Sequence, residues 1–214
     1  MDRSVELLAT HPINQARLAK GKRAATMLWF WGQGKATKLP PFKQVYGLRA
    51  ACISAVDIIR GLGRLAGFDI IPVPGITGYF DTNYKGKAEY ALKALDEYDL
   101  VLVHIEPTDE AGHMGNAKLK IQAIEDTDRL VVGTLLEGLK RRGEPYSILI
   151  SPDHPTSTAL KTHIAEPVPF AYYVSDHPAS THSSPAYTES AVRGSSRRFE
   201  RGFELMRAFL KGER

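Results

Sequence analysis

Five side chains of types that bind transition metals follow apolar, strand-length runs of the sequence. They are, in chain order, Asp109 and His113 after the run 101–105, Asp153 and His154 after the run 147–150, and His163 in the polar turn beyond. Neutral imidazole and carboxylate ligands in combination suit Zn²⁺ or Mn²⁺. Two divalent ions held close together stabilise both the attacking and the leaving oxygen of a phosphoryl transfer. The residue types therefore predict a two-metal site.

Each of these residues also has an ordinary explanation when it is considered alone. A loop around Gly112 would place Asp109 and His113 at the surface, and an acid such as Asp153 is common where a loop begins. A single histidine is more often a surface residue than a ligand. It is the combination, with two acid–imidazole pairs following neighbouring strands, that favours a metal site.

The elements that would position these residues alternate along the chain. Strands are expected at 48–54, 68–73, 100–105, 146–151 and 167–174, and 24–31 is a further apolar run of strand length. Helical spacing of apolar residues indicates helices near 55–65, 88–95, 116–141 and 199–209, with a loop at 175–196. Continuous apolar strands separated by helices are typical of a parallel sheet covered on both faces. Functional loops of such sheets gather at the carboxyl ends of the strands.

Composition is that of a globular protein, and the charge balance suits an anionic substrate. The 214 residues are 43% hydrophobic and 24% charged, with a net charge of +4, and we expect one domain over 1–214 with a peripheral segment at 1–24. Basic residues are spread among acidic ones along most of the chain, so nucleic acid is not an expected partner. No apolar run approaches the roughly 20 residues of a membrane helix, and no signal-peptide core opens the chain. We therefore expect a cytoplasmic protein without a membrane partner, in which the single cysteine, Cys52, is a buried hydrophobe.

Six stretches together resemble the archaeal-type cofactor-independent (2,3-bisphosphoglycerate-independent) phosphoglycerate mutases of the alkaline phosphatase superfamily. In the family's order they are WFWGQGK (29–35), YGLRAACIS (46–54), PGITGYFDTN (74–83), DEAGHMGN (109–116), PDHPT (152–156) and HIAEPVPF (163–170). The resemblance implies an α/β fold with three αβα layers and a mostly parallel central sheet. It also implies interconversion of 2- and 3-phosphoglycerate through a phosphoserine, on two divalent ions. Mn²⁺ or Zn²⁺ is expected, with Mg²⁺ and Co²⁺ as further options.

The same resemblance divides the predicted ligands between two ions. One ion would be held by Asp109, His113 and His163, and the other in part by Asp153 and His154. In the family, the remaining ligands are an N-terminal aspartate and the serine that accepts the phosphoryl group.

Neither of these two groups has a match in the sequence. Asp2 and Ser4 are of the right types, but they are not carried by a strand as the corresponding residues of the family are. We therefore interpret the chain as the C-terminal portion of a longer enzyme, inactive alone, that lacks the N-terminal part of the superfamily core. A sheet without its first strand would expose an edge that favours self-association.

Lys35 is the candidate for contact with a substrate phosphate, because it follows Gly32 and Gly34 and carries a point charge. An ordinary exposed lysine explains the same pattern equally well. Two alternatives to the mutase also remain open. One is a phosphatase or phosphotransferase that acts on another small phosphorylated metabolite, and the other is a non-catalytic metal-binding or interaction remnant.

Overall fold

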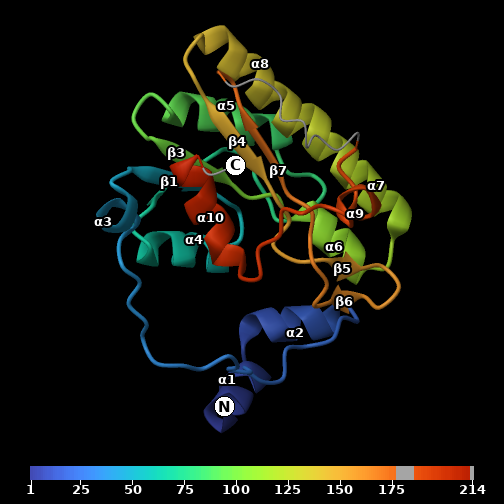
Figure 1. Cartoon of the computed structure of the whole chain (residues 1–214). Helices are drawn as coiled ribbons and strands as arrows, with labels where there is room; N and C mark the ends of the chain where they lie inside the picture. The colour runs from blue at the N-terminus through green and yellow to red at the C-terminus, as the bar shows by residue number, and fades with distance from the viewer. Residues whose placement is uncertain (177–185, 213–214) are drawn as a thin grey trace. The chain divides into compact units, whose positions relative to one another are not determined.

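The computed structural model describes residues 1–176 and 186–212, and it divides the chain into two compact units (Figure 1). The first unit is Met1–Lys38 and the second is Leu39–Arg214. That both belong to a single folding domain stays a prediction. No helix among the described residues is long and apolar enough to cross a membrane.

The first unit contains two short helices and no strand among its described residues. Helix α1 (Asp2–Ala9) is followed by α2 (Pro12–Ala19), whose first turn accepts Pro12 because proline lacks only an N–H that a helix start leaves free. The apolar run 24–31 has the length of a strand but forms none. A strand needs a neighbouring strand, and in this unit no second extended segment supplies one.

The second unit is built on a parallel three-stranded sheet with the order β2-β1-β3. Its strands are β1 (Ala50–Ile53), β2 (Asp69–Ile70) and β3 (Leu100–Val103), and Ala51 pairs with both Asp69 and Val101. Strand β1 is buried along its whole length. Burial on both faces explains why its sequence is apolar without alternation.

Helices cover both faces of this sheet. Cys52 faces α4 (Asp57–Leu65), where a Cβ placed on Gly63 would lie 3.5 Å from the Cβ of Cys52. The next residue, Ile53, points to the opposite face and packs in a cluster with Ala91 of α5 (Tyr84–Ala94). Because successive strand residues alternate between faces, the arrangement has three αβα layers, as expected. Burial raises the pKa of the Cys52 thiol, which fits its predicted role as a hydrophobe.

The long helix expected at 116–141 is present with a π-helical interruption. It consists of α7 (Ala117–Asp126), the π-helix η1 (Thr127–Val132) and α8 (Gly133–Arg142). It lies against α5, and a Cβ on Gly138 would come within 2.2 Å of the Leu92 side chain. The helix is therefore part of the layer that covers the Ile53 face of the sheet.

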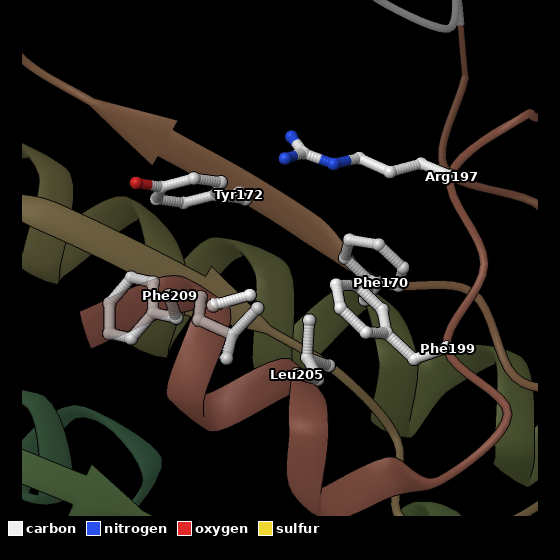
Figure 2. Close-up of a pocket in the computed structure, with 8 residues that line it drawn as sticks. Phe170, Tyr172, Arg197, Phe199, Leu205 and Phe209 are labelled. Atoms are coloured by element: carbon white, nitrogen blue, oxygen red, sulfur yellow. The ribbon is translucent and has the colours of Figure 1, made fainter. Parts of the chain in front are cut away.

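The remaining strands form two antiparallel pairs. One pair joins β4 (Ser147–Ile150) to β7 (Ala171–Val174), and a short hairpin joins β5 (Thr156–Ser157) to β6 (Thr162–His163). Helix α10 (Gly202–Lys211) packs its aromatic side on β7, with the rings of Phe209 and Tyr172 5.3 Å apart (Figure 2).

Three short helices complete the described elements: α3 (Phe42–Tyr46), α6 (Pro107–His113) and α9 (Glu189–Val192). The loop expected at 175–196 thus contains α9, and its residues 177–185 lie outside the described part of the chain.

Truncating Ile53 should destabilise the second unit. Its side chain is fully buried, so Ile53→Ala removes packed methyl groups and should lower the free energy of unfolding by about 2–5 kcal/mol. The matched control is Ile58→Ala on α4, where the side chain is 69% exposed and the change should stay within about 0.5 kcal/mol. Urea unfolding followed by circular dichroism measures both. Equal losses would mean that the core is not centred on β1.

Candidate metal centre

Asp109 and His113 lie on a helix and not on the expected loop. Helix α6 follows β3 after the link 104–106, and Pro107 lies in its first turn, where proline's fixed φ and missing N–H are well tolerated. The loop prediction is therefore wrong for these residues. The helix matters chemically, because side chains four residues apart lie on the same face.

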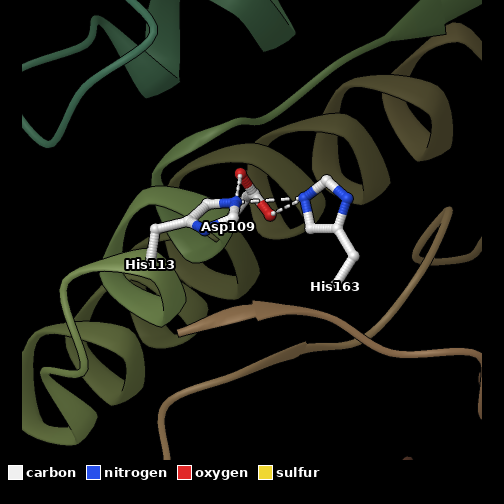
Figure 3. A group of neighbouring side chains, drawn as sticks. All are labelled: Asp109, His113 and His163. Atoms are coloured by element: carbon white, nitrogen blue, oxygen red, sulfur yellow. Dashed lines mark hydrogen bonds and ion pairs between the residues drawn. The ribbon is translucent and has the colours of Figure 1, made fainter. Parts of the chain in front are cut away.

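The structure brings the three residues predicted for one ion together (Figure 3). A carboxylate oxygen of Asp109 lies 3.3 Å from His113 Nε2, and the other lies 3.2 Å from His163 Nε2. The two Nε2 atoms are 3.0 Å apart. Helix α6 supplies two of these side chains, and β6 supplies the third from 50 residues further along the chain. One carboxylate and two ring nitrogens thus converge on one point.

The ring of His113 is held by its other nitrogen. Nδ1 lies 3.1 Å from the carbonyl oxygen of Lys161, in the turn between β5 and β6. A carbonyl oxygen only accepts, so Nδ1 carries the proton and donates it. The lone pair of Nε2 then faces the cluster, which is the tautomer that a metal needs.

Thr156 ties the hairpin to α6, although sequence reasoning gave it no role. Its hydroxyl donates to a carboxylate oxygen of Asp109. The two elements touch at Gly112, where an added Cβ would lie 2.7 Å from the carbonyl oxygen of Thr156. Lys120 Nζ donates to the same carbonyl oxygen at 2.7 Å. The sequence could have indicated Thr156, because it belongs to the stretch 152–156. Only the acid and the imidazole of that stretch were considered as site residues.

Asp153 and His154 lie beside the cluster and belong to no three-ligand group among the described residues. The ring of His154 stacks on that of His163, with centroids 3.7 Å apart. Its Nε2 contacts a carboxylate oxygen of Asp153 at 3.3 Å. The structure thus brings this pair next to the first cluster, and its assignment to a second ion stays a prediction.

A partly buried polar network that adjoins Asp109 was also missed. The ring of His104 lies between the Ser54 hydroxyl, 3.2 Å from Nδ1, and a Glu106 carboxylate oxygen, 3.3 Å from Nε2. Lys87 Nζ donates to the His104 carbonyl oxygen at 2.9 Å. His104 and Glu106 lie in the same strand exit as Asp109, and this proximity was the signal that could have found them.

Burial and like charges shift the acid–base properties of this network. Burial, followed by the charge of Asp109 and other nearby carboxylates, raises the pKa of Glu106. Glu106, Asp109 and Glu110 form a second group of closely spaced carboxylates. Burial lowers the pKa of Lys87 to about 8, against the opposite influence of Glu106. Negative charge thus accumulates at the carboxyl end of β3, where a cation would be stabilised.

Ser4, Asp2 and Lys35 all lie in the first unit. Ser4 donates to the Met1 carbonyl oxygen at 2.5 Å and accepts from the Leu28 N–H at 3.0 Å, so its hydroxyl has a structural role. Asp2 lies at the start of α1. Lys35 is exposed in a segment without helix or strand, and its contact with a substrate phosphate stays a prediction.

The charge on Lys87 should make stability depend on pH. Its folded-state pKa lies below the ordinary 10.5, so the unfolded chain binds more protons between pH 8 and 10.5, and stability contributed at this residue rises with pH. From pH 7 to pH 10, wild type should gain on the order of 2 kcal/mol relative to Lys87→Met. Lys85→Met, at an exposed position of α5, should show no such trend. Urea unfolding at several pH values measures the free energy of unfolding of each protein. A difference between wild type and Lys87→Met that does not change with pH would contradict the lowered pKa of Lys87.

Comparison with known families accounts for most of the chain. The Metalloenzyme superfamily matches residues 9–194. A 2,3-bisphosphoglycerate-independent phosphoglycerate mutase of Methanosarcina mazei is 43% identical over 211 residues, which is 99% of this chain and 53% of that protein. A probable mutase of the same kind from Geobacter sulfurreducens is 45% identical over 98% of this chain and 52% of its own length. The chain thus spans about half the length of the curated relatives it matches.

Solved structures agree with this relationship. A Pyrococcus horikoshii protein aligns with a TM-score of 0.84 and 32% identity, over 98% of this chain and 54% of that one. A cofactor-independent phosphoglycerate mutase of Thermoplasma acidophilum aligns with a TM-score of 0.61 and 25% identity, over 100% and 50%. The resemblance seen in the sequence is therefore confirmed, and the chain belongs to the metalloenzyme superfamily, with phosphoglycerate mutases among its relatives.

Proposed function

We propose that this chain carries one metal site of an enzyme that interconverts 2- and 3-phosphoglycerate, with Asp109, His113 and His163 as the ligands of one divalent ion. The observation that carries the proposal is the convergence of two Nε2 atoms, 3.0 Å apart, on the carboxylate of Asp109. Mixed imidazole and carboxylate ligands suit Mn²⁺ or Zn²⁺. The names of the relatives support phosphoglycerate as the substrate of the whole enzyme.

The second ion would use Asp153 and His154 and further groups outside the matched half of the relatives. The stacking of His154 on His163 supports a second ion close to the first. The serine that accepts the phosphoryl group would likewise come from that other half, so the chain alone is proposed to be inactive. When bound, the ions would stabilise the charge of the transferring phosphoryl group.

The chain's own residues prepare the site for this chemistry. Thr156 holds the Asp109 carboxylate through its hydroxyl, and the carbonyl of Lys161 holds the proton of His113 on Nδ1. Both contacts come from one hairpin, so the hairpin sets the orientation of two ligands and supplies the third. Outer contacts of this kind commonly change metal affinity by about 10–100-fold.

Metal titration of the isolated chain tests the site without any activity. Wild type should bind Mn²⁺ or Zn²⁺, and His163→Ala should weaken binding by more than the roughly 10–100-fold loss expected for Thr156→Val, because it removes a ligand and not an outer contact. His11→Ala, at the start of α2 in the first unit, should bind as wild type does. Isothermal titration calorimetry measures the affinities, and circular dichroism verifies the fold. Undiminished binding by His163→Ala would exclude this site.

Activity is tested in a chimera that joins this chain to the rest of the Methanosarcina mazei relative, in place of its matched region. The chimera should isomerise 3-phosphoglycerate, and Asp109→Ala should lower kcat/KM by about 100-fold or more, because a metal ion contributes several kcal/mol to the transition state. Asp57→Ala, an exposed acid on α4, is the matched control. Release of phosphate without isomerisation would favour a phosphatase, and an active Asp109→Ala chimera would refute the assignment.

A further inference from the structure

An exposed aromatic stretch in the first unit has no role in the metal site. It comprises residues 24–31, and it contains both tryptophans of the chain. The side chains of Trp29, Phe30 and Trp31 are 73%, 73% and 82% exposed. Isolated surface hydrophobics need no explanation, but consecutive large aromatic residues on the surface mark an interaction site.

The backbone of this stretch is fixed by two helices of the same unit. The Asn14 side chain donates to the Ala25 carbonyl oxygen at 2.8 Å and accepts from the Ala25 N–H at 2.9 Å. The Leu28 N–H donates to the Ser4 hydroxyl at 3.0 Å. Asn14 and Ser4 are 4% and 9% exposed, so these contacts are shielded from water. The stretch contains no helix, turn or bend, and it is held in place although no strand lies beside it.

The rest of its backbone is available for pairing. At Thr26, Met27 and 29–31, no backbone group bonds to another residue in the described ranges 1–176 and 186–212. Unpaired N–H and C=O groups beside apolar side chains are a template to which another strand can add. Such an added strand gains main-chain hydrogen bonds and buries the aromatic rings.

Charge disfavours a second copy of this chain as the added strand. Residues 7–38 contain no Asp or Glu, and basic side chains lie at both ends of the stretch: Arg17, Lys20, Lys22, Arg23, Lys35 and Lys38. Two copies paired in either direction would place like charges side by side, which is destabilising. A strand with neutral or acidic flanks avoids this repulsion.

We propose that residues 24–31 dock a β-strand from the part of the polypeptide that the relatives possess outside the matched region. The relatives are about twice as long as the matched stretch, so their other half is long enough to contain such a strand. The strand is apolar with neutral or acidic flanks, pairs with the free backbone groups, and covers the two tryptophans.

Tryptophan accessibility in the chimera described above tests this docking. Subtracting the fluorescence of a chimera that carries both Trp29→Phe and Trp31→Phe leaves the emission of these two tryptophans. Acrylamide should quench them several-fold less in the chimera than in the isolated chain, with a blue shift of their emission. Phe30→Pro removes a free N–H and should restore quenching, whereas Ala36→Pro, beyond the bend at Gly32, should not.

Other outcomes would overturn the proposal. Quenching that is equal in the chimera and the isolated chain would show that nothing covers the stretch. Protection that grows with the concentration of the isolated chain would identify a second copy as the occupant. Protection that appears only with phosphatidylserine vesicles would identify a membrane surface. If the chimera does not fold, co-expression of the two halves replaces it, and failure of two soluble halves to co-purify would equally contradict the docking.

Discussion

The candidate metal centre requires the close contact between α6 and the β5–β6 hairpin. The contact is possible because Gly112 has no side chain at the point where the Thr156 backbone approaches. It brings His163 to His113 across 50 residues of sequence, and it places the Thr156 hydroxyl and the Lys161 carbonyl against the other two candidate ligands. A separation of these two elements would remove one ligand and release the other two.

The charge distribution around this contact explains why a cation fits there. Carboxylates gather where β3 ends, and they raise the pKa of Glu106 together with burial. The neighbouring cations, Lys87 and Lys120, are used in hydrogen bonds to backbone carbonyl oxygens, and burial lowers the pKa of both. Asp109 opposes the effect of burial on the pKa of Lys120, and Glu106 does the same for Lys87. A divalent ion at the candidate metal centre would offset the remaining negative charge.

Much of this arrangement could be predicted from the sequence, because strand burial and metal chemistry both leave local signals. The apolar run around Cys52 predicted the central strand. The family resemblance grouped Asp109, His113 and His163, and their ligand atoms lie close together in the structure. The helix at 107–113 was missed because Gly112 was interpreted as a turn residue, whereas it permits a close helix–hairpin contact. Thr156 and Lys87 were missed because their importance arises from tertiary contacts. Residues 24–31 formed no strand because pairing requires a partner that local sequence cannot supply.

Anomalous diffraction would show whether Asp109, His113 and His163 hold one ion. Crystals of this chain grown with Mn²⁺ or Zn²⁺ should show an anomalous peak bound by the carboxylate of Asp109 and by Nε2 of both histidines. The same three side chains without an ion at saturating metal, or an ion bound through other residues alone, would contradict the account.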